Sequence, residues 1–236
     1  MVERRSRYVK MDGVATGARV QRRRDGLSKE RIVQASIEIL DAGGTDALTF
    51  RALAAHLATG AGAIYWHVAN KDDLLVAATD DIIGKALADG KHDGPPDDAI
   101  RVIALGVFDA LDAHPWMGAQ FSREPWSAML EIFESIGGQI QALGVPEHDQ
   151  FNCASALVNY ILGLAGLYAE GARLAAPVDR TEFLGTVVTR WTQNDPADYP
   201  FAHQVAAELR DHSDRDQFRA GVDLILAGIV HRYRQQ

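Results

Sequence analysis

Cysteine is nearly absent from this chain, which carries one thiol, Cys153, among 236 residues. A single thiol cannot form an internal disulfide, and it offers no paired spacing that could hold a metal ion. The simplest interpretation of Cys153 is a small apolar residue on a helix face. A reducing compartment suits this composition, so we expect a cytoplasmic protein.

Long apolar runs are missing as well. The most apolar stretch, residues 154–169, contains Asn159 and is followed by Glu170, so it is too short and too polar to cross a bilayer. The first 26 residues carry eight basic side chains and no apolar segment of the kind that a secretory signal needs. The sequence therefore predicts no membrane partner.

Signals of catalysis are also lacking. The histidines from His92 to His231 are scattered without a His-x-x-x-His spacing, no glycine-rich loop leads into Lys-Ser or Lys-Thr, and no serine lies in a nucleophile elbow. The acidic pairs at 72–73 and 80–81 are best explained as solvated helix faces. We expect no enzyme activity, no catalytic residue, no metal and no cofactor.

Charge is unevenly distributed along the chain. Residues 1–71 hold 12 Lys and Arg against 7 Asp and Glu, whereas residues 72–236 hold 12 against 25. A basic first part on an acidic body can orient onto a polyanion, which a uniformly acidic protein would repel. Residues 1–26 show no periodic apolar face and are predicted to be a mobile basic arm. The alternative for this segment is a tail without a specific role.

Apolar residues recur at helical spacing, and no alternating run of β-branched residues competes with them. Ser28 and Thr49 are candidate N-caps, and Gly43-Gly44 is expected to end the first helix. The sequence predicts an all-α fold with an arm at 1–26, a three-helix domain at 27–72 and a larger helical domain at 73–236. The predicted helices are 28–43, 49–57, 61–66, 71–88, 97–113, 116–123, 125–143, 146–172, 180–193, 201–210 and 213–234.

Residues 49–66 follow the pattern of a helix-turn-helix. Leu53 and Leu57 form an apolar stripe, Thr59-Gly60 is a small turn, and Ile64 faces inward from a short second helix. This arrangement typically places the second helix in the major groove of DNA. Taken alone, the pattern also fits two helices that simply pack in a core.

Three longer segments resemble a known family. They are Leu48-Thr-Phe-Arg-Ala-Leu-Ala-Ala-His-Leu57, Ile64-Tyr-Trp-His-Val68 and Asn70-Lys-Asp-Asp-Leu-Leu75, and together they resemble the DNA-binding domain of the TetR family of bacterial transcriptional regulators. More weakly, Ala113-His-Pro-Trp116, Asn159-Tyr-Ile-Leu-Gly163 and the segment 218–226 resemble the C-terminal domains of regulators related to the tetracycline repressor.

The resemblance implies a role in DNA binding for particular residues. Thr49, Tyr65, His67 and Lys71 would contact phosphates, and Arg51 would reach a base edge, where guanine O6 and N7 suit it. Trp66 is expected to pack within the domain, and a bracing role is the alternative for Tyr65. The predicted DNA contacts are Thr49, Arg51, Thr59, Ala61, Gly62, Ala63, Tyr65, His67 and Lys71.

The exposed start of the reading helix, Gly60-Ala-Gly-Ala63, has almost no side chain with which to read bases. Each glycine costs a helix about 1 kcal/mol relative to alanine, so we infer that the backbone comes close to the DNA. Ala61 or Ala63 would touch thymine methyl groups. Specificity would then depend on Arg51, on Thr59 and on DNA shape, and the basic arm could enter a minor groove.

So short a reading helix usually acts in two copies on a palindrome. The helices at 146–172 and 213–234 carry small faces, so they are predicted to form a homodimer, and the resemblance implies a four-helix interface there. The alternative is that both helices are simply core.

A pocket for a small molecule is expected in the body, because aromatic side chains gather on its helices. The predicted wall residues are Trp116, Phe121, Trp126, Phe133 and Tyr160, with His114, Gln120, Asn152 and Asn159 as polar partners, although such a set is also typical of plain core. The resemblance implies a homodimeric repressor that a small, largely apolar effector releases from a palindromic DNA operator. The alternative function is a helical protein-interaction module without specific DNA binding.

Overall fold

The computed structural model describes residues 27–90, 94–121, 127–175 and 180–233, and all of their regular structure is helical. A small head consists of α2 (Lys29–Ala47), α3 (Phe50–His56) and α4 (Ala61–Tyr65). The body follows with α5 (Lys71–Asp89), α6 (Pro96–Ala113), the 3-10 helix η1 (Pro115–Met117), α7 (Ser127–Ala142), α8 (Glu147–Ala175), α9 (Arg180–Thr192), α10 (Pro200–Gln204), α11 (Ala206–Asp211) and α12 (Asp214–Tyr233). The prediction of an all-α fold is confirmed.

Side-chain caps set the start of three helices in the first third of the chain. Ser28, Thr49 and Asn70 each accept a hydrogen bond from the backbone N–H three residues further on, at 3.3, 3.1 and 2.8 Å. These bonds satisfy amides that have no partner within their own helix. The local sequence therefore fixes where α2, α3 and α5 begin.

Three predicted helices differ in the structure. The helix expected at 116–123 is only the 3-10 helix η1, Pro115–Met117, with turns as far as Phe121. Gly44 interrupts α2 as expected, with φ at 69°, but the chain resumes a helical turn and runs on to Ala47. The predicted helix at 201–210 is two short pieces, because Val205 leaves the helical conformation between α10 and α11. The predictions at residues 1–26, 91–93, 122–126, 176–179 and 234–236 lie outside the described residues.

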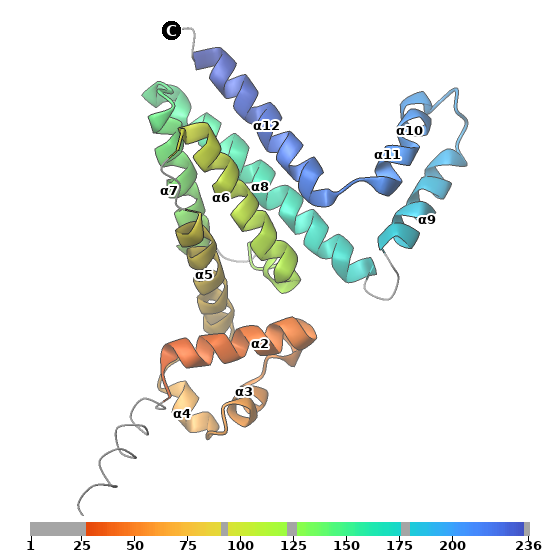
Figure 1. Ribbon diagram of the computed structural model, residues 1–236. Helices are drawn as coiled ribbons and strands as arrows, with labels where there is room; N and C mark the ends of the chain where they lie inside the picture. The colour runs from red at the N-terminus through yellow and green to blue at the C-terminus, as the bar shows by residue number, and fades with distance from the viewer. Residues whose placement is uncertain (1–26, 91–93, 122–126, 176–179, 234–236) are drawn as a thin grey trace, which may run out of the picture.

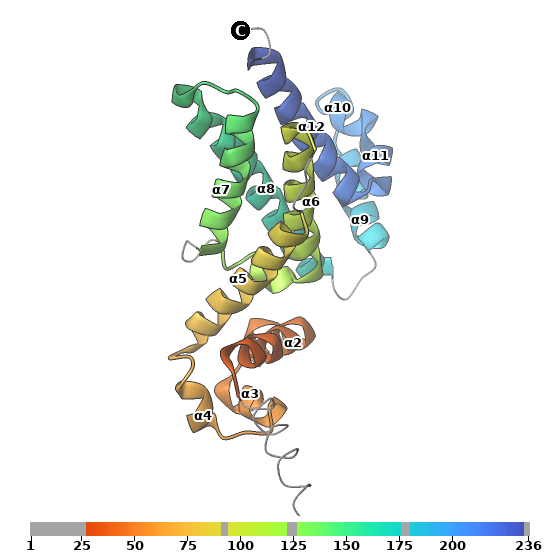
Figure 2. The same ribbon diagram turned by 60° about the vertical axis from the view of Figure 1, so that its left-hand side comes forward.

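The head lies below the body, and α5 connects the two (Figures 1 and 2). This helix packs against α2 in the head and against α6 and α7 in the body. Its buried face includes Leu74 and Leu75 near the head and Ile82 and Ile83 further along. The domain boundary predicted between residues 72 and 73 falls in the first turn of α5, a helix that both parts share.

The core of the body lies among α6, α7, α8 and α12. Phe218 of α12 is fully buried, with its ring centroid 4.7 Å from that of Phe108 and 5.7 Å from that of Tyr160. The Tyr160 hydroxyl donates to the Phe218 carbonyl at 3.2 Å. A Cβ added to Gly221 would overlap the Tyr160 ring and hydroxyl, so this glycine allows α8 and α12 to pack closely within one protomer.

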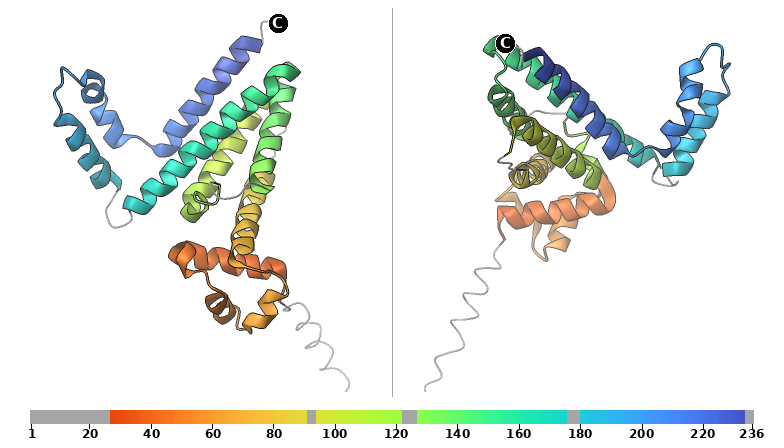
Figure 3. Two further views of the ribbon diagram at one scale, coloured as in Figure 1. Left: turned by 180° about the vertical axis from the view of Figure 1, so that it is seen from behind. Right: turned by 45° about the horizontal axis from the view of Figure 1, so that its top comes forward.

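Arg101 ties α6 to α12 at the edge of this core. Its Nε donates to Asp223 at 2.6 Å, and its NH1 reaches Asp97 at 3.0 Å and Asp98 at 2.8 Å. The hydrogen bond to Asp223 raises the pKa of Arg101 above its ordinary value. Figure 3 shows α8 and α12 running side by side across the body.

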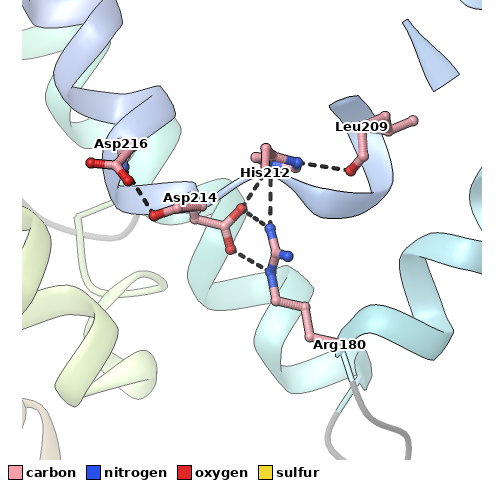
Figure 4. A network of polar contacts seen from close by, with 6 residues as sticks. Arg180, Leu209, His212, Asp214 and Asp216 are labelled. Carbon is pink, nitrogen blue, oxygen red and sulfur yellow. Dashed lines mark hydrogen bonds and ion pairs between the residues drawn. The ribbon is translucent and has the colours of Figure 1, made fainter. Parts of the chain in front are cut away.

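Helices α9, α10 and α11 form a hairpin that projects from the body (Figure 3), and none of their residues is buried. A polar network closes its base (Figure 4). Arg180 at the start of α9 donates from Nε to Asp214 at 2.8 Å, and His212 Nε2 lies 3.0 Å from the same carboxylate. His212 Nδ1 is 2.7 Å from the Leu209 carbonyl oxygen. The network joins the first residue of α9 to the first residue of α12.

Candidate nucleic-acid interface

Helices α3 and α4 form a helix-turn-helix with a tight connection. Ala58 adopts a left-handed conformation, with φ at 51°, and the Thr59 N–H donates to the Ala54 carbonyl at 2.9 Å. Leu53 and Ile64 are fully buried, one from each helix. Their contact with the rest of the head fixes the angle at which α4 faces outward.

The outer face of α4 is as bare as the sequence suggests. Gly62 is exposed, Ala61 and Ala63 are partly exposed, and the structure has no heavy atom within 4 Å of a Cβ added to Gly60 or Gly62. Packing against the described residues therefore gives no reason for either glycine. The space beside α4 is open to whatever approaches the head from outside.

Tyr65 combines a structural contact with exposure. Its ring stacks on Phe50 of α3 with a centroid distance of 4.3 Å, yet the residue is 55% exposed. The stacking braces α3 against α4, which is the alternative role that the sequence analysis gave for Tyr65. It also holds the side chain at the edge of the head, beside the exposed His67.

We expected Trp66 to pack within the head, and this prediction is wrong, because the residue is 90% exposed. Ile64 of α4 and Val68, three residues after α4 ends, occupy the two inward positions. Trp66 lies midway between them in the chain and therefore points away from the core. A tryptophan with this exposure is the largest apolar side chain on the outer face of the head.

Thr49 and Arg51 lie at the first turn of α3. The Thr49 hydroxyl accepts a hydrogen bond from the Ala52 N–H at 3.1 Å, so it has a capping role independent of DNA. Arg51 is exposed, and no hydrogen bond to its guanidinium is found within the described residues. Its five N–H donors are thus available to an external acceptor.

Lys71 has a partner inside the head. Its Nζ donates to the Thr45 carbonyl oxygen at 2.5 Å and links the start of α5 to the last turn of α2. The side chain is half-buried. A phosphate contact by Lys71 therefore stays a prediction, alongside a structural role that the sequence did not indicate.

The folded head is not basic. Residues 27–71 hold four Lys and Arg and four Asp and Glu, so the basic excess of the first 71 residues comes entirely from residues 1–26, outside the described residues. We interpreted the whole first part as a basic head, and the excess of positive charge lies instead in the sequence of residues 1–26.

The predicted pocket residues of the body have separate partners. Trp116 is buried and donates from Nε1 to Asp41, Phe133 of α7 has its ring 6.2 Å from that of Phe151, and Tyr160 packs on Phe218. Phe121 is half-buried against the core, whereas Trp126 lies outside the described residues. An open groove is lined by hairpin residues and contains none of these side chains.

The polar residues predicted beside the pocket divide into three kinds. His114 is bonded to Asp41, and Asn152 and Asn159 are exposed on α8. Gln120 has its Nε2 buried without a hydrogen-bond partner among the described residues. A buried donor without a partner is unfavourable, so Gln120 is the residue of this set that an incoming acceptor would satisfy.

Helices α8 and α12 expose apolar and small residues at helical spacing. Leu167 is 69% exposed and Leu224 is 75% exposed. The exposed residues of this face are Asn152, Ala156, Asn159, Gly163, Leu167, Ala220, Leu224, Ala227, Gly228 and His231. We call this set the α8–α12 face. Gly221 of α12, another small residue, serves the packing of Tyr160 instead.

Other kinds of site leave no trace in the described part of the chain. No group of three His, Cys, Asp or Glu side chains there could hold a metal ion. No helix among those residues is long and apolar enough to span a bilayer.

A helix-turn-helix head on a larger helical body defines a class of DNA-binding regulator, and sequence comparison identifies the family. Residues 32–78 match the family described as bacterial regulatory proteins, tetR family, and residues 92–233 match the tetracyclin repressor-like C-terminal domain. The second match alone covers more than half of the chain. The chain belongs to the tetR family.

Comparison with individual proteins leads to the same family. A helix-turn-helix transcriptional regulator of Saccharopolyspora erythraea is 34% identical over 141 residues, covering 58% of this chain and only 59% of that protein. The transcriptional regulator SCO7222, a TetR from Streptomyces coelicolor, is 50% identical with a TM-score of 0.79, covering 88% of this chain and all of that one. BioQ, solved with its double-stranded DNA operator, is 26% identical with a TM-score of 0.57, covering 87% and 99%.

Measuring the stability of Thr49 variants without DNA tests the capping role of this residue alone. Thr49→Ala removes the acceptor for the Ala52 N–H and should lower the free energy of unfolding by about 1 kcal/mol, measured by urea denaturation. Thr49→Ser keeps the hydroxyl and should retain wild-type stability. Equal stability of the alanine and serine variants would show that the cap contributes nothing.

Proposed function

We propose that the chain is a homodimeric repressor that binds a palindromic operator through α3 and α4 and leaves it when a small, largely apolar effector binds the body. The observation that carries this proposal is the exposed α4 beside Arg51, whose guanidinium has no hydrogen bond to any described residue, in a chain of the tetR family. A repressor acts where the chromosome is, so the protein works in the cytoplasm.

The DNA contacts follow from what each exposed group can offer. Arg51 presents a planar fork of donors that matches the O6 and N7 of guanine. The Tyr65 hydroxyl and the His67 ring, both exposed where α4 ends, would donate to phosphates. Trp66 adds an apolar surface that can lie against the sugar edge. Ala61 and Ala63 of α4, with Thr59 in the turn before it, would line the surface that comes closest to the bases.

Dimerisation uses the α8–α12 face. Leu167 and Leu224 supply exposed apolar area, while Gly163, Ala227 and Gly228 let a second copy approach closely. The two helices already pack on each other within one protomer, so a second copy completes a four-helix interface. A symmetric pair of heads then matches the symmetry of a palindrome.

The effector site is proposed at the turn after η1. Phe121 is half-buried there, and the amide nitrogen of Gln120 is buried without a partner among the described residues. A compound with an apolar body and one hydrogen-bond acceptor would satisfy that donor. It must bind the conformer that releases DNA more tightly than the conformer that holds it.

The alternative function is a helical module that binds a protein partner and no specific DNA. The exposed hairpin aromatics Trp191, Tyr199 and Phe201 favour it. Such a module would show no sequence preference among DNA duplexes.

The first test selects duplexes from random-sequence DNA with purified protein and titrates the enriched site by gel shift at several salt concentrations. We expect a palindrome, a steep fall of affinity with salt, and a loss of about tenfold to a hundredfold with Arg51→Ala. Arg190→Ala removes an equal charge from the exposed hairpin and should bind as wild type. Equal binding to all duplexes would overturn the proposal.

Replacing Gly62 should change the stability of the protein and its binding to the operator in opposite directions. Gly62→Ala should raise the free energy of unfolding by up to about 1 kcal/mol, because alanine favours helix. It should nevertheless weaken operator binding by about tenfold, because the added methyl group separates the α4 backbone from the bases. Gly138→Ala, at another exposed helical glycine with open space around it, should stabilise the protein without changing DNA binding. Unchanged operator affinity in Gly62→Ala would show that α4 does not approach closely.

The effector is sought by screening apolar compounds for release of the operator. Compounds that carry a hydrogen-bond acceptor should act on the wild-type protein and lose about tenfold in potency on Gln120→Leu, whose operator affinity should stay unchanged. The exposed Gln204→Leu serves as the control. If no compound in a broad apolar library binds or perturbs the complex, the effector part of the proposal fails.

A further inference from the structure

One carboxylate of the head accepts hydrogen bonds from the body. Asp41 of α2 accepts two hydrogen bonds at the same oxygen, Oδ1: one from Trp116 Nε1 at 2.8 Å and one from His114 Nδ1 at 2.7 Å. A carboxylate can only accept, so the His114 ring must carry its proton on Nδ1. The partners are 73 and 75 residues away from Asp41 in the chain.

The donors are held firmly in the body. Trp116 is 8% exposed and Met117 is fully buried. The helix that carries them, η1, packs against α6 and α8 as well as against α2. The position of the indole N–H is therefore set by the core of the body, and Asp41 follows it.

The head is thus attached to the body at two places. The first attachment is α5, which continues from the head into the body and packs on α2. A single helix would leave the head free to turn about the helix axis. The second attachment joins Asp41 of α2 to His114 and Trp116, which directly follow the end of α6 at Ala113. In Figure 1 the lower ends of α5 and α6 lie over different parts of α2. Two separate attachments remove that rotation.

We propose that Asp41, through Trp116 and His114, is a positioning residue that fixes the orientation of the reading head and thereby sets the half-site spacing that the dimer accepts. The inference rests on the proposed binding of a dimer to a palindrome. In such a dimer, any rotation of one head on its body changes the separation of the two α4 helices. A fixed head restricts binding to one spacing, and a freed head accepts several.

The test compares the selected operator with versions whose half-sites are moved apart or together by one base pair. Wild-type protein should prefer its own spacing by about tenfold or more. Asp41→Ala should bind that operator more weakly and the altered ones nearly as well, so that the preference falls below about threefold. Trp116→Phe keeps a buried aromatic ring but removes the N–H, and it should also lower the spacing preference.

Glu38→Ala is the matched control. Glu38 is a carboxylate on the same helix, paired at 2.8 Å with His56 inside the head, so its loss changes charge without touching the body. It should leave the spacing preference unchanged. Asp41→Asn keeps an acceptor oxygen and should restore part of the preference that Asp41→Ala loses.

The outcomes separate this inference from the function on which it rests. Because each preference is a ratio measured on one preparation, a loss of folded protein lowers both affinities and leaves the ratio unchanged. A wild-type ratio retained by Asp41→Ala and Trp116→Phe overturns the positioning role and leaves the proposed function intact. A wild-type protein without any spacing preference overturns both.

Discussion

The short length of α4 is the constraint on which the rest of the structure depends. Five residues, two of them alanine and one glycine, offer few groups to a base pair. Such a helix can select a site only if it is held at a fixed angle and if a second copy is held at a fixed distance. Leu53 and Ile64 provide the angle within the head. The proposed dimer face, α5 and the Asp41 contact would together provide the distance.

Under the proposed function, general affinity for DNA and selectivity for one DNA sequence come from different parts of this chain. The folded head carries balanced charge, and the positive excess of the first 71 residues is confined to residues 1–26. Attraction to the phosphate backbone is long-ranged and does not depend on sequence, so a basic arm suffices for it. Selection requires short-range contacts from a rigid surface, and in the proposed complex the exposed Arg51 and Trp66 beside a bare α4 would provide that surface.

Sequence reasoning was most successful where the information is local. Caps at Ser28 and Thr49 and the apolar spacing of the helices predicted most of the fold, because both depend on residues a few positions apart. Contacts between distant residues gave no signal: the Asp41–Trp116 bond and the fit of Tyr160 over Gly221 require the tertiary structure. Trp66 was misjudged because an aromatic residue was assumed to be core, although Ile64 and Val68 already occupy the inward positions. The pocket residues, the DNA contacts and the boundary at residue 72 remain predictions.

The central claim, that the body holds two reading heads at a fixed separation, is tested most directly by a distance measurement between them. A spin label on a cysteine introduced at the exposed Gln34 of α2, with the buried Cys153 replaced by serine, reports the separation of the heads in the dimer by pulsed electron paramagnetic resonance. The account predicts one narrow distance distribution in the effector-free protein, which operator DNA leaves nearly unchanged. A broad distribution that narrows only when DNA binds would contradict it.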